Sequence, residues 1–213
     1  LTTTTLEGPA AGSSLQYGAG RHQIAMLNGQ FLHQLGYQGE GIGIGVLDAG
    51  FRKADDLRAF QHLRRQGKLQ MKRNYVNPGK TVTAGSNHGT TVLSVMGAYS
   101  QNTFTGVAPE ANYHLLKSEN PESEFLVEEI AWVAAAEAAD SAGARIINSS
   151  LGYTTFDDST TSHTYQSLDG ETTPVTRGAA IAADKGMLVV SSAGNKGNNA
   201  WQYISAPADG QEV

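Results

Sequence analysis

Short runs of β-branched residues alternate with longer stretches of helical pattern from Arg21 onward in this 213-residue chain. Strands separated by helices of this length connect through right-handed crossovers, which place the strands parallel in one sheet. We therefore expect an α/β fold with a doubly wound, mostly parallel sheet and helices on both faces. The expected strands are Gly41–Asp48, Gln70–Val76, Ala111–Leu116, Ala144–Ser149 and Met187–Ser192, and the expected helices are Asn87–Tyr99, Glu122–Ala142 and Thr176–Lys185.

The composition excludes several classes of protein. A net charge of −5 and the lack of any Lys/Arg tract disfavour a nucleic-acid partner. No apolar run approaches the ~18 residues that cross a bilayer, so we expect no membrane span. Cysteine is absent, and the six histidines form no H-E-x-x-H pattern, so we expect no metal site. The Thr/Ser/Gly-rich residues 1–16 predict a flexible N-terminal segment or processing linker.

The helix expected over Glu122–Ala142 has clear start signals. Asn120 can cap it, and Pro121 suits its first position. Glu122 and Glu124 then lie where the helix dipole favours negative charge. One face should pack on the sheet through Leu126, Ile130, Val133 and Ala134.

The acidic residues near this helix start have two interpretations. They can be solvated side chains matched to the helix dipole. Alternatively, one of them borders a substrate groove and favours basic side chains of a ligand. The residues concerned are Glu119, Glu122 and Glu124.

Four segments rich in polar residues or glycine lie at the ends of the expected strands or at a helix start. Ligands of doubly wound sheets bind outside the carboxyl ends of the strands. Taken singly, each segment would be an ordinary turn or cap. Together they predict a functional edge, formed by Val46–Gly50 (VLDAG), Asn87–Val92 (NHGTTV), Asn148–Gly152 (NSSLG) and Ser192–Gly197 (SAGNKG).

Over residues 17–213 these segments resemble the subtilisin-like serine proteases, in that family's order and spacing. The resemblance implies a serine endopeptidase that hydrolyses peptide bonds through an acyl-enzyme. It also implies a peptide or protein substrate, a possible propeptide, no cofactor, and a secreted, periplasmic or cell-surface location. The implied fold is the subtilisin-like α/β sheet, incomplete at its C-terminal end.

The resemblance also implies a role for each matching residue. Asp48 would orient His88, which would act as general base and then as general acid for a nucleophilic serine. The Asn195 amide would donate to the tetrahedral oxyanion. Substrate binding would fall to Ser150, Leu151 and Gly152 on one wall of the specificity pocket and to Ala193 and Gly194 on the other.

Two departures from the family pattern matter. No Gly-Thr-Ser motif occurs, so we expect residues 17–213 to be a peptidase domain truncated or cleaved before its serine. A complementary C-terminal fragment would then carry the catalytic Ser. The connection Ser100–Thr105 is shorter than the family's calcium-binding loop, so calcium is possible but its site is not identifiable, although Asp55 or Asp56 could match a ligand position.

Two other functions compete with a protease. A non-catalytic peptide-binding or inhibitory relative would keep the cleft and lack a nucleophile. A nucleotide-binding domain is suggested by the glycines of Gly39–Gly45. However, these glycines precede the strand instead of following it, and the third glycine of G-x-G-x-x-G is missing.

Overall fold

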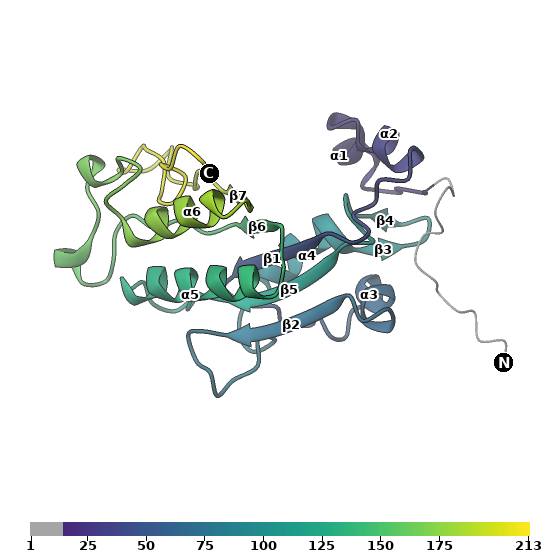
Figure 1. Ribbon diagram of the computed structural model, residues 1–213, viewed down its shortest axis with the longest axis horizontal. Helices are drawn as coiled ribbons and strands as arrows, with labels where there is room; N and C mark the ends of the chain where they lie inside the picture. The colour runs from purple at the N-terminus through teal and green to yellow at the C-terminus, as the bar shows by residue number, and fades with distance from the viewer. Residues whose placement is uncertain (1–14) are drawn as a thin grey trace.

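The chain folds around a five-stranded sheet in the order β2-β5-β1-β6-β7, seen in a computed structural model that describes residues 15–213 (Figure 1). Every neighbouring pair of strands is parallel. The expected α/β fold is therefore confirmed, and the strands begin or end within two residues of their predicted bounds. They are β1 (Gly43–Asp48), β2 (Leu69–Asn74), β5 (Asn112–Lys117), β6 (Ile146–Ser149) and β7 (Leu188–Ser191).

Helices cover both faces of the sheet. Helix α4 (His88–Gly97) packs on one face, and α5 (Val127–Ser141) and α6 (Pro174–Asp184) pack on the other. In Figure 1 the pair α1–α2 stands above the hairpin β3–β4, at the opposite end of the molecule from α6. The smaller elements are α1 (Arg21–Met26), α2 (Gly29–Gln34), η1 (Arg58–Phe60), α3 (Gln61–Arg65), β3 (Tyr99–Ser100), β4 (Phe104–Thr105), η2 (Ser159–Thr161) and η3 (Tyr165–Ser167).

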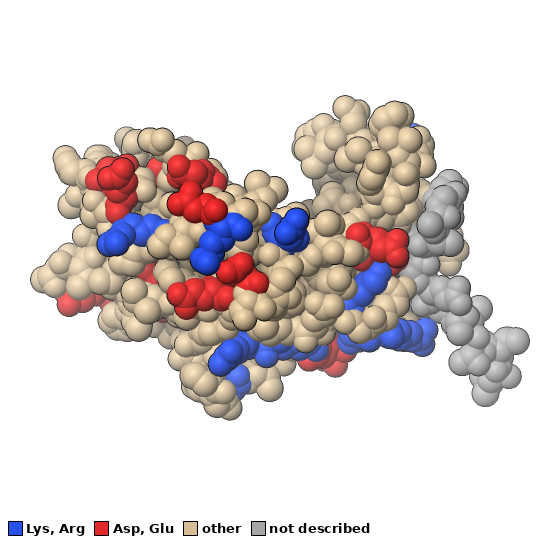
Figure 2. Space-filling model, viewed as in Figure 1, with Lys and Arg blue, Asp and Glu red and all other residues tan. Residues whose placement is uncertain are grey.

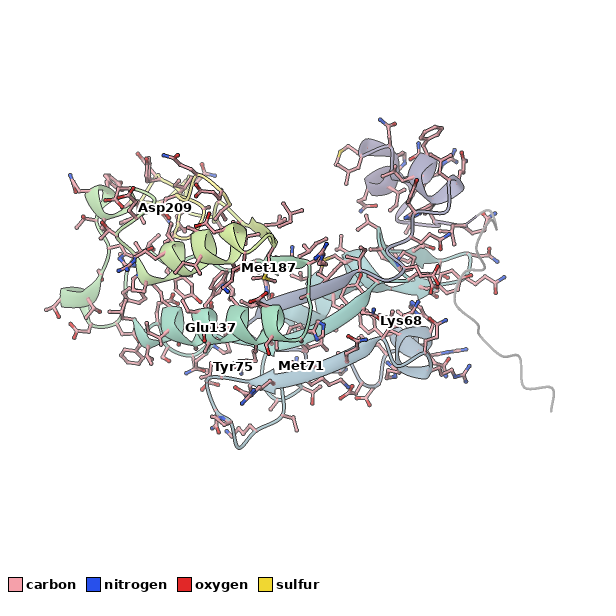
Figure 3. All side chains as sticks on the ribbon, viewed as in Figure 1. Lys68, Met71, Tyr75, Glu137, Met187 and Asp209 are labelled. Carbon is pink, nitrogen blue, oxygen red and sulfur yellow. The ribbon has the colours of Figure 1, made fainter. Side chains whose placement is uncertain are left out.

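The central strands β1 and β5 are buried between two apolar layers, as the inner strands of a parallel sheet require. Along β1, Leu47 points into the layer under α5 and α6, while Val46 points into the layer under α4. Figure 3 labels Met71 on β2 and Met187 at the start of β7, which lie at the two edges of the first layer. This alternation fixes which side of the sheet each strand-end residue faces, because successive side chains point to opposite faces.

The predicted start of the long helix was wrong. Helix α5 begins at Val127, and its N-cap residue, Leu126, makes no capping hydrogen bond with its side chain. The Asn120 side chain instead accepts a hydrogen bond from the Glu122 amide at 3.4 Å and donates to Ser123 Oγ at 2.6 Å. Asn120 therefore closes a local turn several residues before the helix.

The predicted packing face of this helix was also wrong at Ile130, which is 54% exposed. The buried face carries Trp132, whose indole Nε1 donates to Ser149 Oγ at 2.8 Å. Glu129 is buried as well, because His163 and the Val175 amide supply partners for its carboxylate. The other buried residues of α5 are Glu128, Ala135, Ala136 and Ala139.

The N-terminal segment predicted over residues 1–16 lies outside the described residues up to residue 14. Beyond that point the main chain is held to the fold, because Thr105 Oγ1 donates to the Gln16 carbonyl at 3.0 Å. Within residues 15–213 no helix combines the length and apolar character needed to cross a membrane.

Candidate active site

The centre of the site is a carboxylate–imidazole pair formed where β1 ends and α4 begins. His88 Nδ1 lies 2.9 Å from Asp48 Oδ1 and 3.0 Å from Oδ2. Because an ionised carboxylate only accepts hydrogen bonds, Nδ1 must carry the proton, which leaves Nε2 of a neutral ring free to accept one. The Asp48 side chain is fully buried, whereas that of His88 is 53% exposed. The pair therefore presents a fixed tautomer of histidine to solvent.

Gly89 allows the first turn of α4 to approach the end of β1 this closely. Its amide donates to the Gly50 carbonyl at 2.9 Å. A Cβ atom at Gly89 would lie 2.7 Å from Phe51 Cε1 and 2.8 Å from Asp48 Cβ. These distances are far below normal carbon–carbon contact, so any larger residue would push His88 away from its carboxylate.

Burial raises the pKa of Asp48 above its ordinary value, because it removes water from the charged form. The hydrogen bond from His88, that residue's charge, and the amides of Ala49 and Gly50 all act in the opposite direction. The Ala49 amide donates to Oδ1 at 2.7 Å. These donors stabilise the ionised carboxylate that the pair needs to orient an imidazole.

The residues predicted to form the two pocket walls lie beside each other, after the adjacent strands β6 and β7. Ser192 Oγ donates to the Leu151 carbonyl at 3.2 Å, which joins the two segments. The Leu151 side chain is buried in the core, so only its main chain faces the site. Ser150 and Gly152 are half-buried, and Ala193 and Gly194 are exposed.

Ser205, which the sequence analysis did not single out, fills the space between the two predicted walls. Its amide donates to the Ala193 carbonyl at 3.1 Å. A Cβ atom at Gly152 would lie 2.7 Å from Ser205 Cβ, and one at Gly194 would meet Ser205 Oγ at still shorter range. The sequence signal for this arrangement is the pair Gly152 and Gly194. Two glycines indicate that another residue packs closely there, but they do not indicate which one.

Asn195 follows β7 at the same edge of the sheet as Asp48, and its side chain is exposed. Within the described part of the chain its amide has no hydrogen-bond partner, so it is free to donate to a ligand. The next residue, Lys196, is held in place, because its ammonium group donates to Thr154 Oγ1 at 2.5 Å.

The acidic residues near the start of α5 form a cluster. The pKa of Glu119 is raised to about 8, first by burial and then by the nearby carboxylates of Glu124, Glu128 and Asp48. The pKa of Glu128 is raised to about 7, again mainly by burial. Glu124 is not in the helix, because its amide and carbonyl bond instead to Asp157. The interpretation as simple solvated residues therefore fails for Glu119, whereas Glu122 is exposed.

The candidate calcium ligands do not come together. Asp55 forms an ion pair with Lys72 on β2. Within residues 15–213 no group of three or more His, Asp and Glu side chains could hold a metal ion. The Ser100–Thr105 connection forms the turn between β3 and β4.

The fold and the site define an α/β protein whose polar edge carries a carboxylate–histidine pair. The chain belongs to the subtilase family: the model of that family (Peptidase S8) matches residues 39–213. The resemblance seen in the sequence motifs is therefore confirmed.

Solved structures of subtilases show the same fold. MycP1 with its propeptide removed is 16% identical with a TM-score of 0.59, and the match covers 88% of this chain and 58% of that one. The prenylagaramide maturation protease PagA is 25% identical with a TM-score of 0.57, covering 83% and 53%. Fervidolysin from Fervidobacterium pennivorans, described as a keratinolytic enzyme related to subtilisin, is 21% identical with a TM-score of 0.58, covering 84% and 24%. The chain thus spans little more than half the length of MycP1 and PagA, and about a quarter of fervidolysin.

Proposed function

We propose that this chain is part of a serine endopeptidase that cleaves peptide bonds through an acyl-enzyme. The observation that carries the proposal is the pair of Asp48 and His88, with its buried carboxylate and half-exposed imidazole. Such a pair takes a proton from a serine hydroxyl and later delivers it to the leaving amine. Membership of the subtilase family supports this use of the pair.

The nucleophilic serine, in this proposal, lies on a segment outside the 213 residues. On the edge strand β7, Leu188 and Val190 are 58% and 44% exposed. Their apolar surface supports this arrangement, because a further segment of the protein could cover it. They alternate with the buried Val189, so they point to the α4 side of the sheet. A helix packed on this uncovered face would lie on the same side of the sheet as His88, which begins α4.

The remaining site residues are proposed to hold the substrate and its oxyanion. The unpartnered amide of Asn195 would donate to the tetrahedral intermediate, and Asn195→Ala should lower kcat by about 10²–10³-fold. Main-chain groups of Ser150–Gly152 and of Ala193 and Gly194 would bind an extended peptide. Ser205 between them limits the depth of the pocket, which favours small or medium side chains.

The natural substrate would be a peptide or protein, and a propeptide would precede the mature enzyme. Export from the cytoplasm is part of the same proposal, supported by the subtilase family. The likeness to MycP1, whose crystal structure is described as having the N-terminal propeptide removed, supports the propeptide.

A fluorophosphonate probe tests the proposal directly. The full-length protein should label on one serine, and His88→Ala should abolish labelling, whereas the surface variant Lys185→Gln should label normally. Intact mass under native and denaturing conditions should then show whether a complementary fragment carries the label. A correctly folded protein that binds peptides and never labels would instead be the non-catalytic relative.

A further inference from the structure

A polar pocket of about 290 Å³ opens at the carboxyl ends of β2 and β5, next to the carboxylate–histidine pair. It is separate from the predicted pocket walls at Gly152 and Gly194, which follow β6 and β7. Lys117, its deepest basic residue, is the register partner of Asp48 across the β1–β5 pair. The lining residues are Asn74, Val76, Asn77, Lys80, Ala84, Gly85, Lys117, Asn120, Pro121 and Glu122.

Lys117 is the most unusual residue of this pocket. It is only 8% exposed, and within residues 15–213 its ammonium group makes no hydrogen bond or ion pair. Burial lowers the pKa of Lys117, and the nearby charge of Lys80 lowers it further, whereas Glu122 raises it. The ammonium group faces the pocket, where a bound anion would supply the partner that it lacks.

Two asparagines add unused donors to the same pocket. The side-chain oxygen of Asn74 accepts from the amides of Val76 at 3.1 Å and Asn77 at 2.8 Å. The side-chain oxygen of Asn77 accepts from the Gly79 amide at 3.2 Å. Both oxygens are therefore occupied, which leaves the amide nitrogens as donors. With two ammonium groups and one carboxylate, the lining favours an anion.

The pocket is coupled to the site through the loop that presents His88. A Cβ atom at Gly85 would lie 3.4 Å from Lys117 Nζ, so the ammonium group lies against this loop. Ser86, the next residue, accepts a hydrogen bond from the His88 amide through Oγ at 3.1 Å. Figure 2 shows further basic side chains along the lower edge of the molecule, with acidic side chains among them.

We propose that this pocket binds the carboxylate of an acidic side chain, Asp or Glu, in a peptide lying along the site edge. The volume exceeds what a single carboxylate needs and accommodates the methylene groups of such a side chain. The inference rests on the proposed protease function, since it names a feature of that enzyme's substrate. It makes Lys117 and Lys80 specificity-determining residues.

The test compares matched peptides that differ only by Glu or Gln at each position around the scissile bond. The full-length protein should favour one Glu peptide by about tenfold in kcat/KM, the effect of one charge-assisted hydrogen bond. Lys80→Gln and Lys117→Met should bring this ratio close to one, while Lys185→Gln on α6 should leave it unchanged. Lys80 is exposed, so its variant keeps the test valid if Lys117→Met does not fold.

Binding of the same peptides, followed by fluorescence anisotropy, separates this inference from the proposed function. A protein that cleaves nothing and does not react with a fluorophosphonate, yet prefers the Glu peptide in a Lys80-dependent way, contradicts only the protease. Equal binding and cleavage of Glu and Gln peptides overturns the pocket assignment. Stabilisation by inorganic phosphate at constant ionic strength, lost in Lys80→Gln and without any Glu preference, also overturns it in favour of a free-anion site.

Discussion

Replacing Gly152 with alanine tests the arrangement of the predicted specificity pocket. The new Cβ would lie 2.7 Å from Ser205 Cβ, about 1 Å inside the normal carbon–carbon contact distance. Gly152 does not need a left-handed backbone, so this contact is the whole cost. Overpacking of this kind typically costs about 1–3 kcal/mol. For a chain of this size, that lowers Tm by about 2–4 °C per kcal/mol.

The assay is a double-mutant cycle followed by thermal or urea unfolding of the full-length protein. Ser205→Gly removes the atom that the new methyl group meets, so Gly152→Ala/Ser205→Gly should recover most of the lost stability. The coupling free energy should be about 1–3 kcal/mol in favour of the double variant. Gly197→Ala is the matched control, because nothing lies within 4 Å of its Cβ position.

Gly194→Ala should behave differently against the same Ser205→Gly background. Gly194 has a φ of +93°, where a side chain is strained even in open space. Ser205→Gly should therefore restore only part of the stability that Gly194→Ala removes. If the two single changes at Gly152 and Ser205 simply add, Ser205 does not fill the space between the walls, and the account of the pocket is wrong.

Three further outcomes follow from the site and the core. Asp48→Asn should reduce kcat by about 10⁴-fold with little change in KM, because the amide favours the wrong histidine tautomer; assays with a peptide substrate check this. The stability that Glu119 and Glu128 contribute should fall as pH rises from about 4.5 to 8, since in the folded protein, with pKa values of about 8 and about 7, they hold protons that the unfolded chain releases; urea unfolding should therefore show that Glu119→Gln loses less stability than the parent protein over this range. Trp132→Phe should cost about 1–3 kcal/mol in urea unfolding, because it leaves Ser149 Oγ unpaired in the core.

The strands and the contact between Asp48 and His88 were predictable because their signals are local. The run that ends at Asp48 is continuously apolar, as a strand buried on both faces must be. Gly89 directly follows His88, and a side chain at that position would clash with Phe51 and Asp48. The family motifs add the order of these segments along the chain.

The start and buried face of α5 were not predictable, because distant residues determine them. Asn120 and Pro121 form a sequence signal for a helix start, yet the Asn120 side chain donates a hydrogen bond to Ser123 Oγ and caps no helix. Glu129 is buried through partners 34 and 46 residues away, which no local pattern shows. The same applies to Ser205, which reaches the pocket only through the folding of the chain after β7.

The uncovered edge strand β7 has a consequence for handling the protein. Its outer backbone groups have no neighbouring strand within the described sheet, and Leu188 and Val190 expose apolar surface beside them. An edge of this kind is a template on which another chain can add a strand. Without a segment that covers β7, self-association through this strand should therefore increase with protein concentration. Protein prepared without such a segment should be stored at low concentration.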